Sequence, residues 1–262
     1  MSQDTTQRTS MRRRSRVPTV KKAVNEFVRR LREAARPAVA RQSLKYFKPG
    51  DSIYVCGVKT PEVRKFAREL YRRVEGDWGI GDALEFCDSM VRRRELESKA
   101  LGFFLLSHFR DEFRSDLLRR AEGWVVAQLC ENWAAVDTLC GAITSPVLER
   151  NPRTVTSLRR MARSRNMWVR RTAVVTLVPL ARRGMYLDEA YEIVVPLFGN
   201  SEDLMHKALG WLLREAGKTD MERLERFLAR YGHGMPRTTV RYAIERFPET
   251  ARKKLLTDTR GG

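Results

Sequence analysis

The chain repeats one pattern along most of its length, an apolar residue every three or four positions with charged residues between. In the segment 20–35, for example, Val24 and Phe27 fall on one helical face while lysine and arginine occupy the other. A break is expected at Ser145-Pro146, and only the short segment 52–58 approaches alternation with a period of two. The same pattern predicts further helices at 62–74, 82–93, 96–109, 124–132, 134–143, 154–164, 167–182, 187–198, 204–216, 221–230 and 237–247. We therefore expect an all-α protein.

Short sequence units recur at multiples of 36 residues. The segment 99–103 (Lys-Ala-Leu-Gly-Phe) resembles 207–211 (Lys-Ala-Leu-Gly-Trp), and 171–175 fits between them. Their first residues are all cations, and the gaps between them are 72 and 36 positions. A period of this length is typical of solenoids of helix pairs of the TPR and HEAT type. We expect one HEAT-like solenoid domain over residues 20–256, with a concave cationic face, after a basic and disordered tail at 1–19.

The charge balance favours a polyanionic partner. The sequence has 51 lysines and arginines against 32 aspartates and glutamates, which gives a formal net charge of +19. The tail contributes only +4 of this charge, from Arg8, Arg12, Arg13, Arg14 and Arg16 against Asp4. The remaining +15 favours nucleic acid, with the repeated cations Lys99, Arg171 and Lys207 as expected phosphate contacts. The alternative is a solvated basic surface with no particular partner.

Several classes of chemistry lack their signatures in this sequence. The four cysteines form no C-x-x-C pair and there are only three histidines, so we expect no metal site. Phosphate-binding glycine loops, dinucleotide-binding motifs and H-E-x-x-H are absent, and we expect no cofactor. The apolar runs fall far short of the ~20 residues of a membrane span. The expectation is a soluble cytoplasmic protein with no membrane partner.

One carboxylate interrupts the repeat. In the 36-residue register, Asp137 stands where the other units carry Leu101, Ala173 and Leu209. It follows Trp133 by four residues, so the two side chains share a helical face. Two explanations remain open at this point, a surface aspartate paired with an arginine or a carboxylate with a chemical role.

Four segments resemble the AlkD family of DNA glycosylases when they are taken in order. Residues 132–137 are N-W-A-A-V-D, residues 166–171 are N-M-W-V-R-R, and residues 207–215 are K-A-L-G-W-L-L-R-E, followed by Lys218-Thr219. Upstream, residues 56–64 are C-G-V-K-T-P-E-V-R. The resemblance extends over about residues 44–247.

This resemblance implies a right-handed HEAT-like superhelix that holds duplex DNA and releases N3- or N7-alkylated purines. Trp133 and Trp211 correspond to the aromatic residues that face the lesion, and Asp137 corresponds to the catalytic carboxylate. Arg171 corresponds to the arginine beside the backbone of the lesion strand. Tyr46 corresponds to a DNA-contacting tyrosine, in a segment where this chain inserts residues before Gly57. On its own position in the repeat, Trp211 would equally suit a packed core.

The chemistry that the resemblance implies needs few groups. An alkylated purine is already cationic, so it leaves without a general acid, while a fixed carboxylate stabilises the oxocarbenium ion that forms on the sugar. Family members excise the base while it remains stacked. No lysine can be assigned as a Schiff-base nucleophile, so we expect a monofunctional enzyme. The resemblance also implies a monomer, and we expect it to act on DNA of the nucleoid. Expected DNA-binding residues are Tyr46, Lys99, Arg170, Lys207 and Arg214.

Two other functions remain open. A non-enzymatic HEAT-repeat protein that binds damaged or distorted DNA would share the basic surface but would not need Asp137. A protein-interaction scaffold for an acidic partner would show no salt-sensitive affinity for DNA.

Overall fold

The secondary structure is helical throughout the described part of the chain. The computed structural model describes residues 17–49 and 53–260. Within these ranges the one strand-like contact is an isolated bridge between Tyr54 and Glu95. The prediction of an all-α protein is therefore confirmed. The tail expected at 1–19 falls almost entirely in residues 1–16, outside the described residues, and Thr19 already caps the first described helix.

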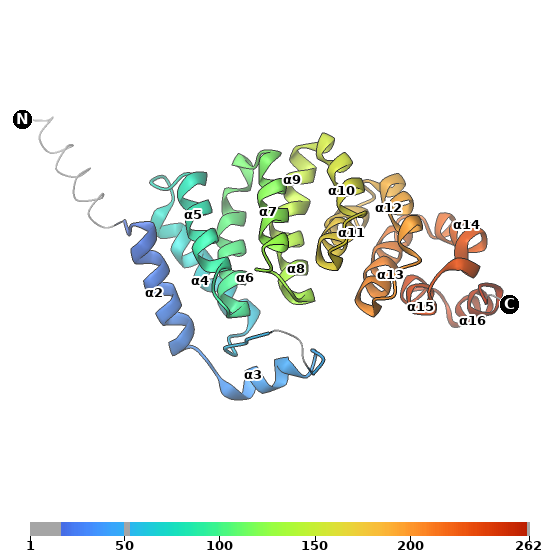
Figure 1. Cartoon of the computed structure of the whole chain (residues 1–262), viewed down its shortest axis with the longest axis horizontal. Coiled ribbons are helices and arrows are strands. Elements are labelled where there is room, and N and C mark those ends of the chain that lie inside the picture. The colour runs from blue at the N-terminus through green and yellow to red at the C-terminus, as the bar shows by residue number, and fades with distance from the viewer. Residues whose placement is uncertain (1–16, 50–52, 261–262) are drawn as a thin grey trace, which may run out of the picture. The chain divides into compact units, whose positions relative to one another are not determined.

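The helices group into two compact units, one up to Phe113 and the other from Arg114 onward (Figure 1). In the first unit α2 packs against α4, α5 and α6, while α6 packs on both α4 and α5. Its core contains Phe27, which meets Phe66 edge to face with ring centroids 6.2 Å apart. The elements of this unit are α2 (Val20–Glu33), α3 (Pro37–Leu44), α4 (Thr60–Val74), α5 (Ile80–Val91), α6 (Leu96–Leu106) and the 3₁₀ helix η1 (Ser107–Glu112).

Residues 56–58, just before α4, are held by a buried carboxylate. Glu97, 5% exposed, accepts hydrogen bonds from the backbone N–H groups of Cys56, Gly57 and Val58 at 2.7–3.2 Å. Gly57 has φ of +89°, and a β-carbon there would lie 2.8 Å from the backbone nitrogen of Ala40, so only glycine fits. Glu97 and Gly57 therefore hold in place a segment that has few apolar contacts, since α3 itself buries no residue.

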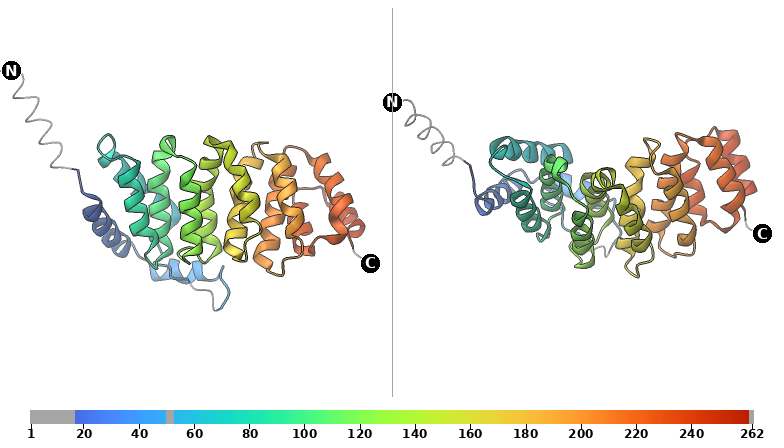
Figure 2. Two further views of the ribbon diagram at one scale, coloured as in Figure 1. Left: turned by 45° about the horizontal axis from the view of Figure 1, so that its top comes forward. Right: turned by 90° about the horizontal axis from the view of Figure 1, so that it is seen from above.

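The second unit is a row of helices that follow one another in chain order in every view (Figures 1 and 2). Here α8 packs on α11, α11 on α13 and α13 on α15, while α10, α12 and α14 each pack against members of that row. This arrangement is that of a helical-repeat solenoid, as predicted. The elements are α7 (Asp116–Val126), α8 (Trp133–Leu139), the π-helix η2 (Cys140–Thr144), α9 (Ser145–Arg150), η3 (Pro152–Thr154), α10 (Val155–Met161), α11 (Met167–Ala181), α12 (Leu187–Val194), η4 (Val195–Leu197), α13 (Asp203–Gly217), α14 (Met221–Tyr231), η5 (Gly232–Gly234), α15 (Arg237–Ala243) and α16 (Glu249–Asp258).

Two expected element boundaries are wrong. The helix expected at 124–132 is α7, which begins at Asp116 and ends at Val126, because Gln128 takes a left-handed conformation with φ of +61°. The break expected at Ser145-Pro146 is absent, because Pro146 occupies the first turn of α9, where no backbone donor is needed. The sequence pattern also missed α3, α9 and α16.

The 36-residue register corresponds to equivalent places in the core. Leu101, Ala173 and Leu209 are each fully buried, as their shared position predicts. In α13 the neighbouring Gly210 lies against α15, where a β-carbon would be 2.6 Å from the carbonyl oxygen of Thr239 and would also collide with Tyr242. The glycine of the K-A-L-G-W segment therefore permits close packing of two helices.

Candidate active site

The helix that carries Asp137 begins at an asparagine cap. The side-chain oxygen of Asn132 accepts a hydrogen bond from the backbone N–H of Ala135 at 2.9 Å, which is the usual way to satisfy the first turn of a helix. Trp133 is therefore the first helical residue of α8, and it is half-buried. Asp137 follows one turn later on the same face, with its side chain 18% exposed.

A second asparagine cap starts α11, which carries Arg171. The side-chain oxygen of Asn166 accepts from the backbone N–H of Trp168 at 2.8 Å. One turn later, Arg171 meets Asp137 in a two-point ion pair: Nε donates to Oδ1 and Nη2 donates to Oδ2, both at 2.9 Å. The Arg171 side chain is only 5% exposed. This paired, parallel geometry is the strongest form of arginine–carboxylate contact.

Arg171 also joins a third helix to this pair. Its Nη1 donates to the carbonyl oxygen of Leu204, in the first turn of α13, at 2.5 Å. Trp211 lies seven residues beyond Leu204, two turns along α13, so the two residues share a helical face. Trp211 is half-buried. One guanidinium group thus links α8, α11 and α13, the three helices that carry the four residues expected at a catalytic site.

Burial governs the electrostatics of the pair. It raises the pKa of the Asp137 carboxyl above its ordinary value, while the charge and hydrogen bonds of Arg171 act in the opposite direction. The buried thiol of Cys140, three residues further along the chain, has its pKa raised to about 12, first by burial and then by the charge of Asp137. This thiol is therefore protonated at neutral pH. The only charges in this buried part of the site are those of Asp137 and Arg171, among the groups the structure describes.

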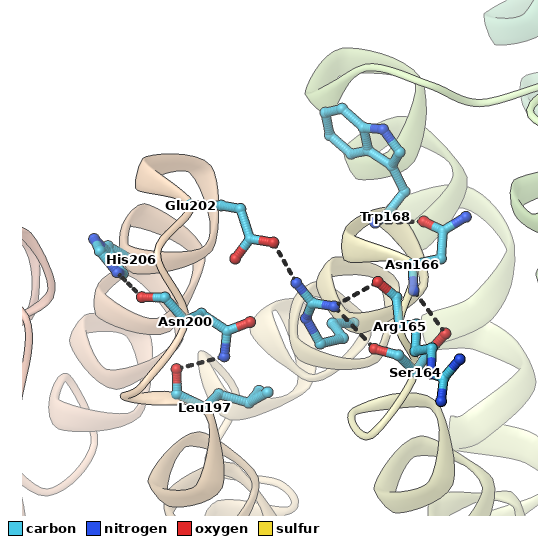
Figure 3. A network of polar contacts seen from close by, with 9 residues as sticks. Ser164, Arg165, Asn166, Trp168, Leu197, Asn200, Glu202 and His206 are labelled. Atoms are coloured by element: carbon cyan, nitrogen blue, oxygen red, sulfur yellow. Dashed lines mark hydrogen bonds and ion pairs between the residues drawn. The ribbon is translucent and has the colours of Figure 1, made fainter.

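Arg170, predicted to bind DNA, has its polar partners in two loops, whose residues Ser164, Arg165 and Glu202 are labelled in Figure 3. Its Nη1 donates to the carbonyl oxygens of Ser164 and Arg165, both at 2.9 Å, and Nη2 pairs with Glu202 at 2.5 Å. Its side chain is 12% exposed. The indole of Trp168 extends away from this network in Figure 3. Arg170 therefore ties the start of α11 to the start of α13.

The other predicted DNA-binding residues differ widely in exposure. Lys99, expected to contact phosphate, is 8% exposed, and its ammonium group donates to the carbonyl oxygens of Val91 and Arg93. Arg214 is 17% exposed and pairs with Glu245. Lys207 is 39% exposed and pairs with Asp203 at 2.9 Å. Tyr46 is 73% exposed, just beyond α3.

The described residues 17–49 and 53–260 contain no cluster of three or more histidine, cysteine, aspartate or glutamate side chains arranged to hold a metal ion. Among the helices formed by these residues, none combines the length and the apolar character needed to cross a membrane. Trp78 and Trp124 are 8% and 6% exposed, so both pack in the core.

Several contributors to the site escaped the sequence analysis. It placed Arg171 in the catalytic set, beside the backbone of the lesion strand, but did not identify it as the partner that is buried against Asp137. The spacing of 34 residues, close to one repeat, was the available signal that the two side chains lie on neighbouring helices. No sequence pattern could identify the Leu204 carbonyl oxygen as a partner of Arg171, because every residue has a backbone carbonyl. Thr144 and Thr176, fully buried polar side chains that hydrogen-bond to each other, also went unnoticed.

Comparisons with known proteins give one family and one fold. The model of a family described as "DNA alkylation repair enzyme" matches residues 27–247. A solved structure described as a predicted DNA alkylation repair enzyme from Enterococcus faecalis is similar with a TM-score of 0.69, at 17% sequence identity, over 82% of this chain and 97% of that one. No curated protein matches the sequence. The structural likeness concerns the fold, and the family match covers every residue of the candidate site.

Proposed function

This chain belongs to the DNA alkylation repair enzyme family, and from that premise we propose that it is a monofunctional DNA glycosylase for cationic N3- and N7-alkylated purines in duplex DNA. The observation that carries the proposal is the buried two-point ion pair between Asp137 and Arg171. It holds a carboxylate in one orientation, one turn after an aromatic residue, Trp133, on a protein with a net charge of +19.

The leaving group makes this reaction feasible with few catalytic groups. When the N-glycosidic bond of an N7-alkylguanine breaks, its electron pair moves to the purine and cancels the positive charge there. The sugar is left as an oxocarbenium ion, to which water adds at C1′ with loss of a proton. The enzyme need only stabilise the sugar cation and orient the attacking water. A general acid is unnecessary.

Asp137 suits the role of stabilising the sugar cation. Each carboxylate oxygen has two acceptor directions, and Arg171 occupies one on each oxygen, so two remain available for a sugar or a water. The remaining exposure of the Asp137 side chain, 18%, is compatible with such access. Arg171 fixes the carboxylate plane before substrate arrives, and this preorganisation lowers the barrier because no group has to reorient during the reaction.

Of the remaining predicted residues, we assign some to the cationic nucleoside and others to the DNA backbone. We assign the half-buried indoles of Trp133 and Trp211 to the cationic nucleoside, where each aromatic face contributes ~0.5–2 kcal/mol. We assign Tyr46 and Lys207 to the DNA backbone, because both keep substantial exposure. We leave Lys99 out of this set, because its ammonium group is buried. Excision with the base still stacked is part of the proposal, since this mechanism needs no extrusion pocket.

The test is release of N7-methylguanine from methylated duplex DNA under single-turnover conditions, with the free base identified chromatographically. Release above the spontaneous rate supports the proposal. Tight, salt-sensitive binding of DNA without release would favour the non-enzymatic DNA-binding function. A salt-independent, weak affinity for DNA would favour the protein-interaction scaffold, because each phosphate contact should contribute about −0.9 to the slope of log affinity against log salt.

A further inference from the structure

A buried seam of hydroxyl and thiol groups joins the two helical segments that carry Asp137 and Arg171. Thr144 and Thr176 share a hydrogen bond of 2.6 Å between their hydroxyl groups, and Thr176 donates to the carbonyl oxygen of Thr172 at 2.7 Å. Ser145 donates to the carbonyl oxygen of Thr176 at 2.7 Å. The Cys140 thiol lies 3.6 Å from the Thr172 carbonyl oxygen. Each of these five residues is at most 3% exposed.

The seam is unlike the corresponding contacts in the next repeat. One period of 36 residues later, the positions of Thr172 and Thr176 hold Ala208 and Leu212, and those of Thr144 and Ser145 hold Leu180 and Ala181. All four are fully buried and apolar. Apolar packing is therefore sufficient to stack these helices elsewhere. At the junction that carries the carboxylate, hydroxyl groups take the place of these four apolar side chains.

The seam also coincides with an irregularity in the backbone. Asp137 and Thr144 are separated by seven positions (144 − 137), whereas their partners Arg171 and Thr176 are separated by five (176 − 171). The π-helix at Cys140–Thr144 lies within the longer of these two spans. A π turn holds more residues than an α turn, and such turns often occur at functional sites. Hydrogen bonds from Thr144 and Ser145 to Thr176 fix the far end of that turn against α11.

We propose that Thr176, together with Thr144, is a positioning residue that fixes the Asp137 carboxylate relative to Arg171. This inference rests on the proposed glycosylase function. Apolar contacts are non-directional, whereas a hydroxyl-to-hydroxyl bond of 2.6 Å is directional. A single buried polar contact can set the register of two helices in this way. Because catalysis is sensitive to displacements of about 1 Å, the seam acts on the rate without touching DNA.

The decisive comparison uses Thr144→Val/Thr176→Val, which removes both hydroxyl groups and keeps the volume. Replacing both partners of a buried hydrogen bond by apolar groups of the same shape is nearly neutral for stability. We expect this double variant to fold and to bind methylated duplex DNA within about twofold of wild type. We expect its single-turnover release of N7-methylguanine at saturating enzyme to fall by about 10- to 100-fold. The single variant Thr176→Ser keeps the hydroxyl group, so its excision rate should stay close to that of wild type.

Thr259→Val is the matched control. Thr259 is 2% exposed and, like Thr176, donates its hydroxyl to the carbonyl oxygen four residues earlier, here Leu255 at 2.6 Å. It lies at the end of α16, outside the segment that matches the family. Any loss that reflects only a missing buried hydroxyl should appear in this variant as well. Equal excision rates for wild type and the double valine variant would overturn the inference.

A second readout needs no substrate. The pKa of the Asp137 carboxyl can be followed by carbon-13 NMR in the free protein. Because Arg171 lowers that pKa against the effect of burial, a looser pair should raise it further in the double valine variant and not in Thr259→Val. An unchanged Asp137 pKa would contradict the inference even if the wild-type protein releases no alkylpurine. A wild-type protein that releases no alkylpurine would count against the proposed glycosylase function and not against the positioning role of Thr176.

Discussion

The guanidinium of Arg171 occupies one acceptor direction on each carboxylate oxygen of Asp137, at 2.9 Å, and holds the carbonyl oxygen of Leu204 with its third nitrogen. The two explanations for Asp137 that the sequence left open are therefore compatible. The aspartate is paired with an arginine, and this pairing is what gives the carboxylate a fixed orientation. Removal of either partner should therefore affect folding and, in the proposed mechanism, excision as well.

Asp137→Asn is expected to abolish most of the excision activity and to destabilise the protein. The amide cannot stabilise a sugar cation, so the single-turnover rate should fall by about 10²–10³. Arg171 is then left buried without a counter-charge, which costs about 3 kcal/mol, the lower end of the range for breaking a buried ion pair. Urea unfolding together with base release measures both effects. Asp188→Asn, at a carboxylate 79% exposed and paired with Arg223, is the control and should change neither.

The excision rate should fall at acidic pH, and this fall should occur at a higher pH than the ordinary pKa of an aspartate would give. Asp137 is active only when ionised, and burial raises the pKa of its carboxyl above the usual value of about 3.9. The rate should therefore fall as pH decreases through this raised pKa. The charge of the alkylated base is fixed by its alkyl group and does not titrate. A pH profile of single-turnover rates checks this, and Asp137→Asn should not show the fall.

The sequence was sufficient for the architecture and it singled out Asp137 as a candidate, but it did not predict the surroundings of that carboxylate. Helical periodicity and the 36-residue period carry local and nearest-neighbour information, and both Leu101 and Leu209 are buried as the register requires. The partner of Asp137 depends on how neighbouring helices are aligned. A π turn at Cys140–Thr144 alters that alignment, and no sequence pattern indicates it. Charge and the repeat likewise suggested a phosphate contact for Lys99, whereas its ammonium group binds backbone carbonyl oxygens inside the first unit.

Arg171→Lys should separate a structural role of this arginine from a phosphate contact. Lysine keeps the positive charge but cannot form two parallel bonds to Asp137 and a third to Leu204. We expect DNA affinity to change by less than about threefold, because the charge is kept and the side chain is buried. We expect excision to fall by about tenfold or more. Arg183→Lys, at an exposed arginine with a two-point pair to Glu149, is the matched control. A large loss of affinity with an unchanged rate at saturation would restore Arg171 to the phosphate-contacting set.

Gly210→Ala should destabilise the second unit. A β-carbon at this position would lie 2.6 Å from the Thr239 carbonyl oxygen and against Tyr242, so α13 and α15 would have to separate. Overpacking of this kind costs about 1–3 kcal/mol. Gly123→Ala is the control, since Gly123 lies in α7 with no atom within 4 Å of the added carbon. That change should stabilise the helix by about 0.5–1 kcal/mol. Thermal unfolding of the two variants should therefore shift in opposite directions.

Glu215→Gln should lower stability at neutral pH, and the loss should shrink in acid. Glu215 is 1% exposed and accepts from Arg182 at 2.7 Å and from Lys218 at 2.6 Å, which ties the ends of α11 and α13 together. Burial acts to raise the pKa of this carboxyl, but the hydrogen bonds and charges of Arg182 and Lys218 together lower it. A carboxylate with a lowered pKa contributes stability above its unfolded-state pKa of about 4.3, and this contribution is lost as pH falls through the folded-state value.

For this variant we expect a deficit of about 1.5–3 kcal/mol at pH 7, the range for a hydrogen bond to a charged group. The deficit should diminish steadily below about pH 4, where the unfolded wild-type chain takes up a proton at Glu215 and the folded chain resists it. Urea unfolding of wild type and Glu215→Gln between pH 3 and pH 7 measures this difference. Glu222→Gln is the control, because Glu222 is 82% exposed and pairs with Arg226 within one helix. A deficit that stayed constant with pH would mean that the Glu215 carboxylate is held by its shape and packing, and not by the two cations.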